Sequence, residues 1–97
     1  MKNYLYISYN SDKNLKDCQW YDGLDDVRTE RGITCNAYTL SLARVGSWTS
    51  PDGSGCYLLD FQSDMTELID TKWASHVMTL LPCALRELKL NKLLQWN

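Results

Sequence analysis

The chain lacks the residue patterns that usually mark an enzyme or a metal protein. It has a single histidine, His76, and no Cys-x-x-Cys pair, because its four cysteines are separated by 17, 21 and 27 residues. That spacing does not match a closed zinc site, and no phosphate-binding sequence of the GxxxxGK(S/T) kind is present. The sequence therefore predicts no catalytic residues, no metal and no cofactor.

Long hydrophobic runs are also missing. The sequence has no stretch of about 18 apolar residues, the length that suggests a membrane-spanning helix. The opening MKNYLYISYN has no apolar core of the kind found in secretory signal peptides. We therefore expect a cytoplasmic protein with reduced thiols, although an even number of cysteines also permits two disulfides. We expect the four cysteines to act as small packing residues: Cys18, Cys35, Cys56 and Cys83.

What the sequence does contain is typical of one small folded domain. Its 97 residues suffice for one hydrophobic core, so we expect a single domain over 1–97. Charge is unevenly distributed: residues 1–70 hold eleven acidic and six basic residues, whereas 71–97 hold one acidic and four basic residues. An acidic surface repels nucleic acid and attracts basic partners, which disfavours direct DNA or RNA binding by residues 1–70.

The first half of the chain predicts a strand, a helix and a second strand. Residues 3–9 alternate two apolar sets and predict a strand, and 10–14 read as a turn. We expect a helix over 15–31 that ends at Gly32. Strand character returns at 33–45, where the alternation shifts phase near 37–38 as at a β-bulge.

The second half predicts a hairpin followed by helices. TSPDGSG (49–55) has the residues of a reverse turn before the strand CYLLDF (56–61). The more specific alternative is that this glycine-containing segment is a phosphate-binding loop. The helical apolar spacing begins after the N-cap Ser63, with Asp64 and Glu67 in the first turn, and runs to Leu81.

Pro82 predicts a bend and then a second helix, although its leucines also alternate as in a strand. The expected fold is α+β, with a small, mainly antiparallel sheet of about three strands and two to three helices.

His76 is the natural candidate for a catalytic base. It lies in the apolar stripe of the predicted helix, beside Trp73 and Val77, which is typical of a packing histidine. A Cys–His pair would require a thiol brought to it by the fold, and nothing singles out two carboxylates as an acid and base pair. We therefore expect no enzymatic activity.

The stretch DCQWYDGLDD (17–26) concentrates acidic residues without a lysine or arginine. On a helix over 19–31, Trp20, Leu24 and Val27 would share a core face, with a row of carboxylates opposite at steps of about 6 Å. Such a row matches the phosphate spacing of a nucleic-acid strand and could occupy a basic groove. Two alternatives remain open: Asp22 as a helix N-cap, or a solvated surface. The row consists of Asp22, Asp26 and Glu30.

The whole chain resembles the type I-F anti-CRISPR proteins that phages and other mobile elements encode. The resemblance rests on the 97-residue length, the opening MKNYLYISYN, the acidic DCQWYDGLDDVRTE and the absence of an enzyme motif. Some members mimic DNA and occupy the basic target-DNA channel of the crRNA-guided surveillance complex, contacting its large subunit and its backbone subunits. The resemblance therefore implies an inhibitor in the host cytoplasm.

What the resemblance implies for this sequence is a set of partner-binding residues. Tyr21, and with it Trp20, would pack at the interface. The acidic contacts would come from Asp12, Asp17, Asp22, Asp25, Asp26 and Glu30.

The alternative function is an antitoxin or immunity-type protein that neutralises a basic toxin or nuclease.

Overall fold

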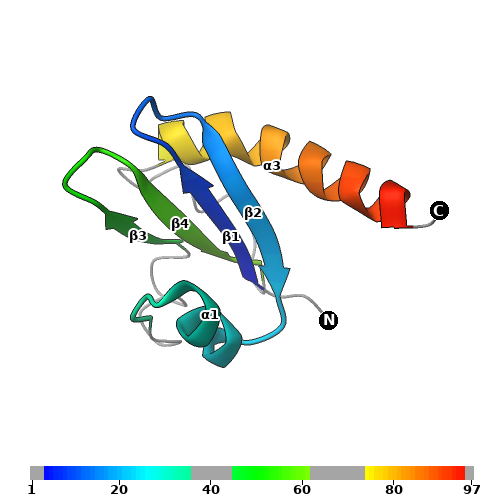
Figure 1. The fold of residues 1–97 in the computed structure, drawn as a ribbon, viewed down its shortest axis with the longest axis horizontal. Coiled ribbons are helices and arrows are strands. Elements are labelled where there is room, and N and C mark those ends of the chain that lie inside the picture. The colour runs from blue at the N-terminus through cyan, green and yellow to red at the C-terminus, as the bar shows by residue number, and fades with distance from the viewer. Residues whose placement is uncertain (1–3, 36–44, 62–73, 96–97) are drawn as a thin grey trace.

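The computed structural model describes residues 4–35, 45–61 and 74–95 (Figure 1). Two hairpins are each followed by a helix, which gives the α+β class expected from the sequence. The sheet has four strands instead of about three, and the described residues hold two helices. The elements are β1 (Tyr4–Tyr9), β2 (Leu15–Tyr21), α1 (Leu24–Arg31), β3 (Val45–Thr49), β4 (Gly55–Asp60) and α3 (Ala74–Gln95).

The strands form one antiparallel sheet in the order β2-β1-β4-β3. β1 occupies a central position, and all six of its residues are buried. Its pairing with β2 is interrupted by a bulge: Ser8 lies opposite Asp17 and Tyr9 opposite Leu15, which leaves Lys16 as the extra residue. This bulge lies near the β1–β2 turn.

The helices cover opposite faces of the sheet, and each face has its own core (Figure 1). The alternation predicted for 3–9 is confirmed over the six residues of β1, because Leu5 and Ile7 face α3, whereas Tyr4 and Tyr6 face α1. On the α3 side, Leu5 and Ile7 join a cluster that also contains Leu59, Val77, Leu80 and Ala84. On the α1 side, Tyr4 and Tyr6 join Tyr21, Leu24, Val27, Cys56 and Leu58.

The helix predicted over 15–31 is wrong in its first half. Residues 15–21 are the strand β2, and the helix begins only at Leu24. Alternate residues of β2 serve the two faces, since Cys18 lies opposite Ile7 and Gln19 opposite Tyr6. Pairing with β1, together with the packing of alternate β2 side chains on the two faces of the sheet, outweighs the helix propensity of the segment.

The predictions for the turns are confirmed. A turn at 10–14 joins β1 to β2, and 49–55 joins β3 to β4 as a hairpin with Gly53 at φ 91°. Gly32 ends α1 in the left-handed conformation at φ 68°. Of the strand predicted over 33–45, residues 33–35 are not a strand, Val45 begins β3, and the expected bulge at 37–38 lies outside the described residues.

α3 is one helix where two were expected. It runs through Pro82 without an end, so the predicted helix boundary at this proline and the strand alternative after it are both wrong. Pro82 cannot donate a backbone hydrogen bond to the carbonyl of Met78, but both residues are exposed, so water can satisfy that oxygen. The predicted N-cap Ser63 and first turn lie outside the described residues. In the described part, no helix is long and apolar enough to cross a bilayer.

Candidate functional site

α1 carries most of the predicted partner-binding residues. Leu24 and Val27 anchor it by packing against Tyr4, Tyr6 and Leu58 on the sheet. Its N-cap is Gly23, which supplies no side-chain hydrogen bond, so the alternative role of Asp22 as N-cap is wrong. The carboxylates of the first turn instead favour the positive end of the helix dipole.

The structure gathers four of the predicted carboxylates around this helix and separates two others from them. Asp12 lies in the β1–β2 turn, at the end of the sheet far from α1, so it does not extend the row (Figure 1). Asp17 lies on β2. The regular row of three is reduced to two helical members, Asp26 and Glu30, because Asp22 precedes the helix. The exposed acidic residues around α1 are Asp22, Asp25, Asp26 and Glu30.

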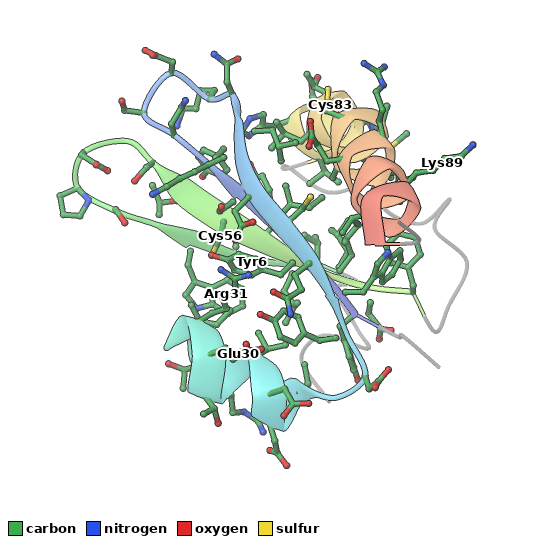
Figure 2. All side chains as sticks on the ribbon, turned by 45° about the vertical axis from the view of Figure 1, so that its right-hand side comes forward. Tyr6, Glu30, Arg31, Cys56, Cys83 and Lys89 are labelled. Atoms are coloured by element: carbon green, nitrogen blue, oxygen red, sulfur yellow. The ribbon has the colours of Figure 1, made fainter. Side chains whose placement is uncertain are left out.

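Arg31, the last residue of α1, binds three side chains of β2. Its Nη1 forms an ion pair with Asp17 at 2.8 Å, and its Nη2 donates to Gln19 at 3.0 Å. Its Nε donates to the Tyr21 hydroxyl at 2.8 Å, and the guanidinium lies over the Tyr6 ring at 4.3 Å (Figure 2). Arg31 thus fixes the helix on the sheet and neutralises Asp17.

Arg28 compensates a further charge on the exposed side of α1. Its Nη1 lies 2.7 Å from the Asp25 carboxylate, which is 96% exposed, so this pair is weak. Its Nε and Nη2 both donate to the Cys35 carbonyl, at 2.9 and 2.7 Å. Among the described residues at this surface, the four exposed carboxylates and Arg28 carry a formal charge of −3. We name this surface, formed by Asp22, Asp25, Asp26, Arg28 and Glu30, the α1 acidic surface.

The predicted aromatic contacts are not part of that surface. Tyr21 is only 3% exposed and packs under α1. Burial raises the pKa of its hydroxyl, against the opposing effect of Arg31, and the Glu30 carboxylate raises it further. Trp20 faces the other side of the sheet, where its ring meets Phe61 edge-on at 5.0 Å between centroids.

Both ring nitrogens of His76, the single histidine, are within hydrogen-bond distance of other groups. The Nδ1 of His76 lies 2.7 Å from the Tyr57 hydroxyl and its Nε2 lies 3.0 Å from the Lys13 carbonyl. A carbonyl only accepts, so in the neutral imidazole Nε2 carries the proton and Nδ1 accepts from Tyr57. All four cysteines are free thiols. Burial raises the pKa of Cys56, which opposes formation of a thiolate nucleophile there.

Among residues 4–35, 45–61 and 74–95, no three His, Cys, Asp or Glu side chains are placed to hold a metal ion. Comparison with protein-family models, curated proteins and solved structures found no match to this chain.

Sequence reasoning did not identify Arg31 as the organising residue of this region. The one available signal was its position as the last basic residue before Gly32, where arginines commonly interact with a helix C-terminus. Its partners Asp17, Gln19 and Tyr21 are spaced two residues apart, as on one face of a strand. A helix predicted over 15–31 hides this spacing, because it does not place the three residues on one face.

Proposed function

We propose that this protein is a small inhibitor that uses the α1 acidic surface to bind the basic target-DNA channel of a type I-F CRISPR surveillance complex in the host cytoplasm. The observation that carries the proposal is the concentration of four exposed carboxylates around one short helix. The partner surfaces would be the large subunit and the backbone subunits, whose lysines and arginines normally hold phosphates.

The charge distribution supports such a mode of binding. Asp26 and Glu30 are one helical turn apart, a rise of about 6 Å, which is of the same order as the separation of neighbouring phosphates. The exposed basic residues Arg86 and Lys89 lie on α3, on the opposite face of the sheet, and therefore do not face the α1 acidic surface (Figure 2). An acidic surface presented in this way accelerates encounter with a basic groove.

The test is a gel shift of target DNA on the surveillance complex, with the protein added beforehand at increasing concentration. The parent protein should abolish the shifted band, because both ligands need the same cations, and its affinity should fall as salt rises. The variant Asp26→Asn with Glu30→Gln should need at least about tenfold more protein, since removing one partner of a desolvated charge pair typically costs about 2–5 kcal/mol.

A matched control removes two charges elsewhere. Asp12 and Glu87 are exposed and distant from α1, so Asp12→Asn with Glu87→Gln should inhibit like the parent. Equal inhibition by both double variants would show that the α1 acidic surface is not the site. No association with the complex at low salt would refute the inhibitor proposal, and capture of a basic toxin or nuclease would then support the immunity-type alternative.

A further inference from the structure

A polar cleft opens on the α1 side of the sheet, beyond the end of the helix. α1 has eight residues, about 12 Å, and cannot cover strands that extend about 20 Å. The uncovered part forms a cleft of about 270 Å³ whose lining includes Ser8 and Cys56 from the two central strands. Figure 2 shows Arg31 between α1 and the strand that carries Cys56.

Among the residues that the structure describes, the lining of this cleft is rich in hydrogen-bond donors and includes no carboxylate, in a chain with twelve acidic and ten basic residues. Lys16 and Arg31 supply two cations, and the Thr49 and Ser50 hydroxyls are further donors. The Ser8 and Ser54 hydroxyls also line the cleft but already donate, to the Asp17 carbonyl and to the Asp52 Oδ1. Arg31 retains a second N–H on both Nη1 and Nη2 beyond its bonds to β2.

Lys16 lines the cleft from the β-bulge in β2. It is the extra residue between Leu15 and Asp17, and such bulges commonly redirect a side chain beside a functional site. Its ammonium forms no hydrogen bond to another described residue. The Asp52 Oδ1 accepts from the Ser54 hydroxyl and amide, which lower the pKa of that carboxyl, and Lys16 lies near enough to lower it further.

The TSPDGSG loop contributes to the cleft although it is a hairpin turn and not a phosphate loop of the usual sequence. The Ser50 amide donates a hydrogen bond to the Ser54 carbonyl at 2.8 Å, which closes the turn. Both serines also line the cleft. Trp48 and Ile33 add an apolar wall beside these polar groups. An apolar or aromatic wall with a few polar groups that fix orientation is a common arrangement in small-molecule sites.

We propose that this cleft binds a small molecule through an oxyanion group, a phosphate or a carboxylate. Lys16 and Arg31 contact the anion, Thr49 and Ser50 donate from the hairpin, and Trp48 packs against any substituent. Arg31 is already paired with Asp17, whereas Lys16 forms no ion pair with another described residue, so Lys16 is the cation of the cleft that is available to a ligand. The volume accommodates an oxyanion with a short substituent.

The test is an NMR titration of the full chain with inorganic phosphate, acetate or phenyl phosphate, each against sodium chloride at equal ionic strength. Saturable shifts should appear at the amides of Thr49, Ser50 and Ser54. The arms separate the two anion classes, and tighter binding of phenyl phosphate than of phosphate would support the apolar wall.

Lys16→Gln should weaken binding about tenfold or more, because a hydrogen bond to a charged group is lost and the fold does not depend on this ammonium. The matched control Lys89→Gln removes an exposed cation from α3 and should bind like the parent. Unsaturated shifts that chloride reproduces, or equal binding by the two variants, would overturn the proposal.

Discussion

Replacing Arg31 with alanine should destabilise the fold more than any other exposed or half-exposed charge change around α1. The Tyr21 hydroxyl, on a residue 3% exposed, would lose a charge-assisted bond worth about 1.5–3 kcal/mol. Loss of the contact with the Tyr6 ring adds about 1 kcal/mol. Asp17 and Gln19 are exposed and regain water, so their bonds contribute about 1 kcal/mol together.

The expected total of about 3.5–5 kcal/mol is a large part of a typical stability of about 5–15 kcal/mol. Urea unfolding followed by circular dichroism gives the free energy of unfolding. Arg31→Lys should recover only part of the loss, because one ammonium cannot reach three acceptors at the positions of a guanidinium. Arg28→Ala is the control, since its ion-pair partner Asp25 is almost fully exposed. A loss for Arg31→Ala no greater than that for Arg28→Ala would refute this account of how α1 is held.

Other predictions concern pH, thiols and the end of α1. Burial raises the pKa of Tyr6 and Tyr57 to about 12, so the native state keeps protons that the unfolded chain loses near pH 10. Stability to urea should therefore fall between pH 10 and 12, and the tyrosinate absorbance of these two residues at 295 nm should appear at higher pH than that of an exposed tyrosine. A chromogenic disulfide reagent should modify the exposed Cys83 quickly and the buried Cys56 only at the rate of unfolding; equal rates would contradict the burial. Gly32→Ala should lower the free energy of unfolding by about 1 kcal/mol in thermal or urea denaturation, because its φ is positive.

Sequence patterns predicted the elements whose local and tertiary preferences agree. β1 alternates because both of its faces are buried, and the TSPDGSG hairpin follows from turn chemistry alone. β2 was missed because its residues fit a helix about as well as a strand, and only the pairing with β1 decides between them. Pro82 was read as a helix boundary because the sequence does not reveal that the carbonyl it leaves unpaired would face solvent.

The acidic surface around α1 could be predicted in part for a related reason. Charge density is visible in the sequence, and the structure exposes the carboxylates of α1, whereas their role as a binding site stays a prediction. Their neutralisation was not, because Asp17 meets Arg31 across fourteen residues and between two different elements. The burial of Tyr21 likewise depends on where α1 crosses the sheet, which local periodicity does not specify.

The position of β1 at the centre of the sheet has a consequence for synthesis of the chain. Its partner on one side, β2, follows immediately, but its partner on the other side, β4, begins only at Gly55, and the helix that covers the Leu5 and Ile7 face begins at Ala74. The first hairpin therefore emerges from the ribosome with an unpaired central edge and an uncovered apolar face, which are conditions that favour aggregation. Stable folding must wait for the last quarter of the chain, so ribosome stalling after β3 should leave nascent chains that are sensitive to protease.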